Sequence, residues 1–371
     1  MNKSQKYSGQ FNQVLSLIDY VTKNPKRNYK KWMWGEALFN YALSELDDFI
    51  GTDRYFHFYN AYCKHWYDKN PIVNMADRAA PGLVTYAIEK KTGHKTAKEL
   101  TQKVLHYVKN APRLIDGTVN HLGSSFEGKF YPKSIWVDSL MMFAVFPMRY
   151  ANEQHDAKLL DFAADQPWFY AKRLMDEETN LWYHAYWVNT KTLEKSHPFP
   201  RKRIFWGRGN GWVVAALPML LQYLPVAHPQ YQTIITILQE TSEALLPYQR
   251  DDSYYETVFN YVGKTYRESS ATALIAAGWL HAANEGWLDE KFKVAGKKAF
   301  LSLCGNFRIE NGAPVAMTEI SAPTIPTTRL PYYGYKLMPR GENWGYGLAA
   351  LIFAAIAYEK SLRLNQDNHE K

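Results

Sequence analysis

The sequence predicts an all-α chain folded as an (α/α)6 barrel, in which six helical hairpins close into a ring. Apolar residues recur at helical spacing in about twelve segments, and no convincing series of alternating strands is present. The connection inside each helical pair is long, whereas the connection to the next pair is short. Because alternate loops of consecutive antiparallel helices emerge at opposite ends, all the long loops are expected on one face of the ring.

The first three predicted pairs span residues 11–22 with 34–47, 55–67 with 81–91, and 97–109 with 135–150. Their apolar spacing is interrupted by Pro25, Gly51, Pro71, Gly93 and Pro112, which end helices or begin loops. The second helix of each pair is expected on the inside of the ring.

The last three pairs span residues 157–174 with 210–223, 231–247 with 269–284, and 289–303 with 346–363. Their interruptions include Pro225, Gly286 and Gly305. Two inner helices are rich in Gly and Ala, over 271–278 and 348–357, which allows helices to pack closely.

We expect residues 1–371 to form one domain. An open α-solenoid is the alternative, since it is also built from stacked helical hairpins. The closed ring is favoured because the chain has no regular repeat consensus, and because its long loops contain many aromatic residues and glycines.

The composition is that of a chain with a large packed core, with 46% hydrophobic and 22% charged residues. Two distant cysteines, Cys63 and Cys304, exclude a disulfide framework and a zinc site of the CxxC type. The apolar stretch 346–358 is too short to cross a bilayer. No apolar signal-peptide core precedes the first helix, so we expect a cytoplasmic protein that does not contact a membrane.

Several chemical classes lack their motifs. The sequence contains no HExxH, GxSxG or phosphate-loop lysine motif. The net charge of +8 favours anionic partners, but solubility alone would also explain it. A nucleic-acid partner is not expected, because the basic residues form no known binding motif and are not interleaved with the aromatic ones.

Polar and aromatic clusters stand where the long loops enter the inner helices, so a closed barrel would bring them to one mouth. They are Trp32, Trp34 and Glu36; Asp77 and Arg78; Trp136 and Asp138; Trp206, Arg208, Asn210 and Trp212; Glu268, Ser269 and Ser270; and Asn343, Trp344 and Tyr346. The chain has 27 Tyr, 18 Phe and 12 Trp, and aromatic faces stack on sugar rings. Aromatic residues inside the helices are expected to pack in the core instead.

Two carboxylates at this mouth are candidates for acid–base chemistry. Asp138 is predicted one turn into an apolar helix, where burial would raise its pKa and suit a general acid. A first-turn acidic residue could instead simply stabilise the helix dipole. Asp77 could likewise serve only to cap the helix that begins at Pro81.

The string from Trp206 to Trp212 places Arg208 between two Trp residues in a glycine-rich turn. Its glycines allow a ligand to approach the backbone, and the guanidinium could clamp a carboxylate through two hydrogen bonds. Basic runs at 23–31 and 201–203 would attract an anion or would simply be solvated. His184 could bind a ligand or be a structural histidine.

Five motifs resemble the unsaturated glucuronyl and rhamnogalacturonyl hydrolases, and most closely glycoside hydrolase family 105. The similarity spans about residues 30 to 360, and the motifs cover 135–141, 181–184, 206–212, 266–273 and 346–347. Members of this family are (α/α)6 barrels, which agrees with the pattern of loops. Two regions depart from the family pattern: Arg78 replaces an apolar residue, and the segment 311–340 matches poorly.

The resemblance implies hydration of the C4=C5 double bond of a uronic acid that a polysaccharide lyase leaves at a non-reducing end. Asp138 matches the general acid and base, and Asp77 the second carboxylate, which would orient water or sugar hydroxyls. His184 and Arg208 match positions that contact the uronate. The other expected substrate-binding residues are Trp34, Trp136, Trp206, Trp212, Glu268, Ser269 and Trp344. The resemblance implies no metal and no organic cofactor.

The expected substrate is an acidic unsaturated oligosaccharide of disaccharide size. Unsaturated galacturonyl-rhamnose is the default, and a sulfated rhamnose partner, as in ulvan fragments, is the alternative. An inverting glycosidase acting on saturated sugars through Asp77 and Asp138, and a non-catalytic carbohydrate-binding barrel, also remain possible. The protein is expected to be a monomer or a homodimer.

Overall fold

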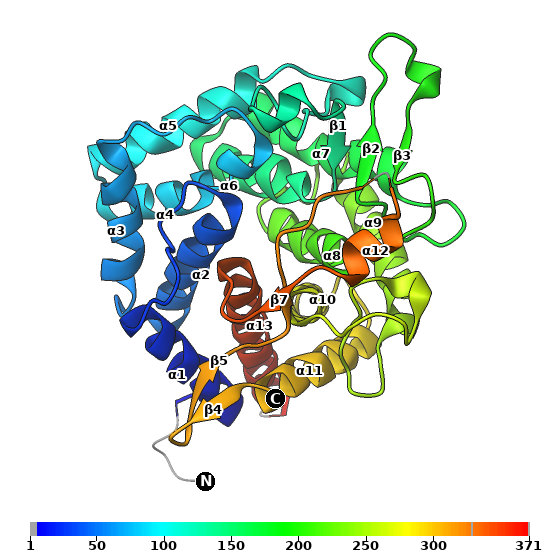
Figure 1. Cartoon of the computed structure of the whole chain (residues 1–371). Helices are drawn as coiled ribbons and strands as arrows, with labels where there is room; N and C mark the ends of the chain where they lie inside the picture. Colours follow the sequence, from blue (N-terminus) through cyan, green and yellow to red (C-terminus); the bar gives the residue numbers. More distant parts are fainter. Residues whose placement is uncertain (1–5, 328, 370–371) are drawn as a thin grey trace.

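The computed structural model describes residues 6–327 and 329–369, and its helices form a closed double ring (Figure 1). The outer ring contains α1 (Gly9–Lys23), α3 (Phe56–Tyr67), α5 (Lys95–Asn110), α7 (Ala157–Leu174), α9 (Tyr231–Leu245) and α11 (Glu290–Gly305). The inner ring contains α2 (Trp34–Ile50), α4 (Gly82–Thr92), α6 (Phe146–Gln154), α8 (Gly207–Leu221), α10 (Ser269–Asn284) and α13 (Gly345–His369). The predicted (α/α)6 barrel is confirmed.

The outer helices are amphipathic and carry local end signals. In α1 the buried positions include Phe11, Val14, Ile18 and Val21, which share one helix face. The hydroxyl of Ser8 caps this helix by accepting a hydrogen bond from the backbone N–H of Phe11 at 3.2 Å. These signals lie in the sequence itself, which is why the predicted and observed helices agree closely.

The inner helices pack so closely that small residues are required. A Cβ atom on Gly278 of α10 would lie 2.0 Å from the carbonyl oxygen of Val214 in α8. Since neither backbone can move without its whole helix, only glycine fits at this crossing. The Gly- and Ala-rich stretches identified in the sequence therefore allow the inner ring to close.

The Gly278→Ala variant is expected to lose about 3 kcal/mol of unfolding free energy, because the added methyl group overpacks the α8–α10 contact. Urea unfolding followed by circular dichroism measures this loss. Gly305→Ala is the matched control, since a Cβ there meets no atom within 4 Å and its stability should change by less than about 0.5 kcal/mol. Equal stability of the two variants would contradict the packing argument.

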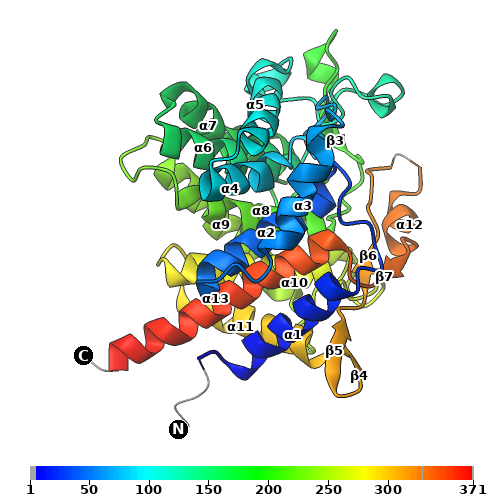
Figure 2. The same ribbon diagram turned by 90° about the vertical axis from the view of Figure 1, so that its left-hand side faces the viewer.

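Short strands occupy the long loops. Strands β1 (Ser134–Trp136), β2 (Ala185–Trp187) and β3 (His197–Phe199) form one antiparallel sheet, in the order β1-β2-β3. Two strand pairs lie in the last long loop, and they join β4 (Arg308–Glu310) to β5 (Ala313–Ala316) and β6 (Ile320–Ser321) to β7 (Arg340–Gly341). Helix α12 (Pro331–Lys336) lies between β6 and β7. Figure 2 shows that these strands and α12 gather at one end of the barrel.

The predicted helix over residues 135–150 is partly wrong. Its first part is strand β1 and a turn, a π-helical segment spans Met141–Val145, and α6 begins only at Phe146. Nearly every side chain from Ser134 to Ala151 is buried, so apolar spacing carries no information on which face points inward. Asp138 therefore lies in the turn after β1, and not one turn into a helix.

One hydrophobic cluster includes buried side chains from α1 to α13, from Phe11 to Tyr358. Among the residues that the structure describes, no helix has the length and apolar character needed to cross a membrane.

Candidate functional site

The candidate site lies at the end of the barrel that carries the long loops. Several chain segments supply it: the start of α2, the 3-10 turn Ala76–Arg78 before α4, the loop 120–124, the turn after β1, the residue before β2, the first turn of α8, α12, and the start of α13. The sequence predicted that the long-loop ends carrying Trp34, Asp77, Asp138, Arg208 and Trp344 would meet at one mouth, and the contacts described below join segments from these loops.

Strand pairing places His184 beside Asp138. Strand β1 pairs with β2 so that Trp136 opposes Ala185, and the backbone N–H of Val137 donates to the carbonyl of His184 at 2.9 Å. The Nε2 atom of His184 lies 3.4 Å from Oδ2 of Asp138. These two side chains are 46 positions apart in the chain, so only the sheet register brings them together.

A second loop contact places His121 beside Asp77. The backbone N–H of Ala76 donates to the carbonyl of His121 at 2.8 Å, and Nε2 of His121 lies 3.5 Å from Oδ1 of Asp77. Gly123 makes this approach possible: its φ is +50°, and a Cβ there would lie 2.0 Å from the carbonyl oxygen of Asn74. The loop from 120 to 124 thus fixes the carboxyl of Asp77 against a buried imidazole.

The two carboxyls have opposite pKa shifts. Burial, and then the negative charge of Asp138, raise the pKa of Asp77 to about 8. Burial also acts to raise the pKa of Asp138, but the facing His184, with His121 and the charge of Arg208, outweighs it and lowers that pKa. At neutral pH the proton of the pair therefore sits on Asp77, and Asp138 is ionised.

The lowered pKa of Asp138 contradicts one expectation from the sequence. The sequence led us to expect a raised pKa for Asp138, on the ground of burial alone. Burial is present, since only 15% of the Asp138 side chain is exposed against 17% for Asp77. The groups around Asp138 decide the direction of its pKa shift, and these groups come from other long loops and from α8.

The protonation states of the two histidines follow from burial. Burial lowers the pKa of His121 to about 3 and also lowers the pKa of His184, so both rings are neutral at pH 7. An ionised Asp138 only accepts hydrogen bonds, so the proton of His184 belongs on Nε2, which faces it. The Nδ1 atom then accepts from the hydroxyl of Tyr335 at 2.9 Å. Tyr335, in α12, therefore fixes the tautomer of His184.

Aromatic rings form the walls between these polar groups. Trp136 stacks on His121 at 4.0 Å, and Trp206 stacks on His184 at 4.1 Å between ring centroids. On the α2 side, Trp34 stacks on Tyr346 at 4.5 Å and meets Trp212 edge-on at 5.9 Å. Trp344 extends the second wall by stacking on Tyr346 at 6.0 Å. Trp34 and Trp344 are partly exposed and could stack on a sugar ring, whereas Trp136, Trp206 and Trp212 are at most 5% exposed and pack on neighbouring protein groups.

Arg208 carries a fully buried positive charge. Its guanidinium lies between the rings of Trp206 and Tyr346, at 4.7 and 4.9 Å from their centroids. Its Nη atoms donate to the carbonyl oxygens of Ser321 and Ala322 at 2.9 and 3.0 Å. No acidic side chain of the described residues lies within 4.0 Å of it. The expected carboxylate clamp is thus directed at backbone carbonyls here, and the charge has no direct counter-ion.

Glu268 and Ser269 occupy a different place from the one expected. Glu268 is fully buried, and its carboxylate caps α10 by accepting from the N–H groups of Ser270 and Ala271. It also accepts from the N–H of Ser321 at 2.9 Å. Ser269 is buried as well. Glu268 therefore supports the surface of the site from behind, because its carboxylate is engaged within the protein.

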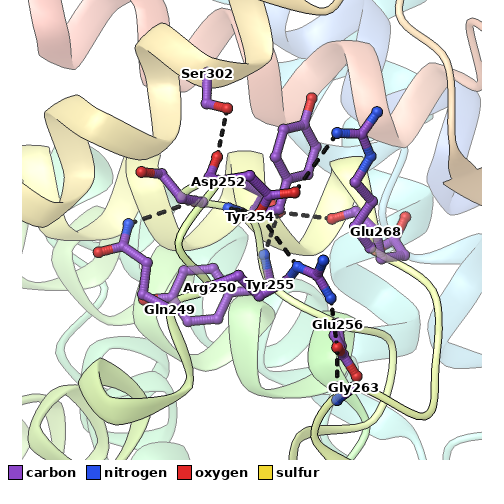
Figure 3. A network of polar contacts seen from close by, with 12 residues as sticks. Gln249, Arg250, Asp252, Tyr254, Tyr255, Glu256, Gly263, Glu268 and Ser302 are labelled. Atoms are coloured by element: carbon purple, nitrogen blue, oxygen red, sulfur yellow. Dashed lines mark hydrogen bonds and ion pairs between the residues drawn. The ribbon is translucent and has the colours of Figure 1, made fainter.

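The loop between α9 and α10 is held by its own polar network (Figure 3). Buried Glu256 accepts from Arg250 at 2.6 Å and from the backbone N–H of Gly263 at 2.9 Å. The backbone carbonyl of the neighbouring Thr257 accepts from the N–H of Gly207, the first residue of α8, at 2.8 Å. The turn that carries Arg208 is therefore anchored before any ligand binds.

Sequence reasoning missed His121 and Tyr335. His121 lies in a loop between the two carboxylates in sequence, and its isolated position between Asn120 and Leu122 gave no helical or motif signal. Tyr335 lies in the segment that matched the family pattern poorly. The described part of the chain contains no group of three or more His, Cys, Asp or Glu side chains that could hold a metal ion.

The family model described as Glycosyl Hydrolase Family 88 matches residues 8–362. The chain is 27% identical over 363 residues to the unsaturated rhamnogalacturonyl hydrolase YesR of Bacillus subtilis (strain 168), covering 95% of this chain and 97% of that protein. It is 26% identical over 210 residues to an unsaturated 3S-rhamnoglycuronyl hydrolase of Alteromonas sp. (strain LOR), covering 55% of this chain and 50% of that protein.

A solved structure of a family 105 glycoside hydrolase from C. acetobutylicum ATCC 824 shares the fold, with a TM-score of 0.81 at 24% identity. The superposition covers 93% of this chain and 99% of that one. The match to the family model spans nearly the whole chain, which confirms the resemblance seen in the sequence motifs. The chain belongs to Glycosyl Hydrolase Family 88, and it is a glycoside hydrolase.

Proposed function

We propose that this protein removes the 4,5-unsaturated uronic acid from the non-reducing end of oligosaccharides that a polysaccharide lyase produces. The observation that carries the proposal is a pair of carboxyls in opposite protonation states beside a buried arginine without a counter-ion. Because Arg208 is fully buried and its Nη atoms bond backbone carbonyls, its charge would favour the carboxylate of a uronic acid in the site from a distance, without direct contact. The names of the YesR and Alteromonas relatives support the same substrate class.

The reaction adds a proton to C4 and the hydroxyl of water to C5. The product is a hemiketal, which opens and releases the neighbouring sugar. Asp138 is placed to take the proton of the attacking water, because it is ionised in the free protein. The proton that C4 receives comes from Asp77 by one of two routes. Asp77 protonates C4 directly, or it passes its proton to Asp138 after the uronate has added its negative charge, and Asp138 then protonates C4. Both routes consume the proton that Asp77 holds.

The remaining residues bind and orient. His184 presents Nε2–H to Asp138, and His121 presents its neutral ring to Asp77. Trp34 and Trp344, which are partly exposed, would pack against the sugar rings, and the buried Trp136, Trp206 and Trp212 would support the site from behind. We further propose that residues 1–371 act as one catalytic unit, since a single hydrophobic cluster includes every helix of the double ring.

The default substrate is unsaturated galacturonyl-rhamnose, and the sulfated-rhamnose disaccharide is the alternative. The test is the loss of the ultraviolet band of the C=C–O group when the purified protein meets each unsaturated disaccharide. Release of sugar from the saturated counterparts would instead support an inverting glycosidase, which also uses one protonated and one ionised carboxyl. No reaction with any unsaturated disaccharide would refute the proposal.

The Tyr335→Phe variant is expected to lower kcat by about tenfold, because Nδ1 of His184 loses its donor and the ring is no longer held in one tautomer. A change in the pH profile of kcat/KM identifies the tautomer effect, which a purely structural loss would not produce. Tyr332→Phe is the matched control, since its hydroxyl donates to the carbonyl of Lys264 at an exposed position. An unchanged profile in Tyr335→Phe would show that Tyr335 does not control His184.

A further inference from the structure

Ser139 is a fully buried serine that follows Asp138 directly, between β1 and the π-helical segment. The backbone N–H of Met141 donates to the carbonyl of Asp138 at 3.2 Å, which holds the chain here in a tight turn. The hydroxyl oxygen of Ser139 lies 2.8 Å from Nδ1 of His121. One turn therefore carries the carboxyl of Asp138 and also contacts the imidazole that faces Asp77.

The ring of His121 is held in a fixed position. Its backbone N–H donates to the carbonyl of Ser134 at 2.9 Å, and its side chain is only 2% exposed. Trp136 stacks on the ring at 4.0 Å with an angle of 5° between the two planes. The two ring nitrogens therefore keep their partners, which are Ser139 on the Nδ1 side and Asp77 on the Nε2 side.

The direction of the bond between Ser139 and His121 follows from the serine hydroxyl. A buried hydroxyl hydrogen needs an acceptor, and among the described residues the contact with Nδ1 is the only hydrogen bond that Oγ of Ser139 makes. The buried hydroxyl of Tyr170 lies near Ser139 without a hydrogen bond, and it needs an acceptor itself. Ser139 therefore donates to Nδ1. Because the ring of His121 is neutral, its single proton then lies on Nε2.

This tautomer determines how the carboxyl of Asp77 presents its proton. The Nε2 atom of His121 lies 3.5 Å from Oδ1 of Asp77. The distance is long for a hydrogen bond in the free protein, and such contacts commonly shorten when a substrate binds. An N–H on Nε2 makes Oδ1 the accepting oxygen and leaves the carboxyl proton on Oδ2. In the other tautomer, Nε2 would accept the carboxyl proton and hold it away from the substrate.

We propose that Ser139 is a positioning residue, whose hydroxyl keeps the proton of His121 on Nε2 and so leaves the proton of Asp77 free for the reaction. This inference rests on the proposed function and adds to it the group that orients the consumed proton. The turn after β1 then serves both carboxyls, because it carries Asp138 and controls Asp77 through His121.

The Ser139→Ala variant removes the donor to Nδ1, so that His121 can carry its proton there and accept from the carboxyl of Asp77. We expect kcat to fall about tenfold. The alkaline limb of kcat/KM should move up by about one pH unit, because an accepting Nε2 stabilises the protonated carboxyl, whereas an N–H stabilises the ionised one. A purely structural loss would lower kcat and leave the limb in place, and that result would overturn the inference.

The charged and titratable groups that face Asp77 and His121 all remain in this variant. They are Asp138, Arg78, Glu127 and His184. Because the substitution removes only an uncharged hydroxyl, a shift of the alkaline limb reports a change in the bond between His121 and Asp77.

Two further variants serve as controls. Ser139→Thr keeps a hydroxyl at this position and should restore most of the kcat and the wild-type alkaline limb. Ser361→Ala is the matched control, since Ser361 is equally buried on α13 and its hydroxyl donates to the carbonyl of Tyr358 at 2.7 Å. It should leave both kcat and the alkaline limb unchanged.

Nitrogen NMR of protein labelled at histidine shows the tautomer without any substrate. The signals of His121 are those lost in His121→Gln. The wild type is expected to carry the proton on Nε2, and Ser139→Ala should shift part of the population to Nδ1. A wild-type ring protonated on Nδ1, or the same tautomer in both proteins, would overturn the inference even if the unsaturated disaccharide reacts. If no unsaturated disaccharide reacts, the proposed function fails, and the NMR still decides whether Ser139 sets the tautomer.

Discussion

The Asp138→Asn variant is expected to lose about 10³-fold or more in kcat, because the amide can neither take a proton from water nor return one. The substitution is nearly isosteric, so the rings of Trp136 and Trp206 and the contact between β1 and β2 should remain. Loss of the ultraviolet band of the unsaturated disaccharide measures the rate. Quenching of tryptophan fluorescence by the same substrate checks that binding survives.

Asp161→Asn is the matched control for this substitution. Asp161 lies in α7 with 67% of its side chain exposed, and its near contact is His228. Its variant should retain wild-type kcat. If Asp138→Asn kept more than about a tenth of the wild-type rate, Asp138 would not be the group that acts on water.

The Asp77→Asn variant is expected to lose about 10²-fold in kcat and to change the pH profile. In the wild type, kcat/KM should fall as the pH rises through about 8, because Asp77 then loses the proton that the reaction consumes. The amide does not titrate, so the residual activity of the variant should lack this alkaline limb. Initial rates from pH 5 to about 10 test this expectation.

The pH dependence of the free energy of unfolding gives a second measurement of the pKa of Asp77, independent of activity. The native pKa of Asp77, about 8, lies above its unfolded value near 3.8, so the native state keeps a proton that the unfolded state has lost between these values. The free energy of unfolding therefore contains a contribution from Asp77 that is full below about pH 4 and is lost as the pH rises to 8. Asp77→Asn should remove this slope. A wild-type slope that persists in the variant would show that another group carries it.

The sequence predicted the barrel well because the information that defines it is local. Apolar spacing, the hydroxyl of Ser8, and glycines such as Gly51 and Gly93 mark the bodies and ends of helices within a few residues. The alternation of long and short loops then restricted how the hairpins could be arranged. The one clear error, over residues 135–150, fell where both faces of the chain are buried.

The candidate site was predicted less completely. Asp77, Asp138, His184 and Arg208 were identified because they lie at the ends of long loops or within the family motifs. His121 was missed because its role depends on the approach of the loop at Gly123 to Asn74. Glu268 was placed on the surface of the site, whereas it caps α10 and accepts from Ser321.

The sequence by itself determined nearly all of the helices, which end of the ring carries the long loops, and that Asp77, Asp138 and most of the aromatic side chains lie there. Only the tertiary structure decided which carboxyl holds the proton. Burial affects Asp77 and Asp138 alike, but His184 reaches Asp138 through the β1–β2 register and Arg208 reaches it through the turn of α8. A pKa depends on the charges and dipoles within a few ångströms, and long-range contacts between segments distant in sequence set those distances.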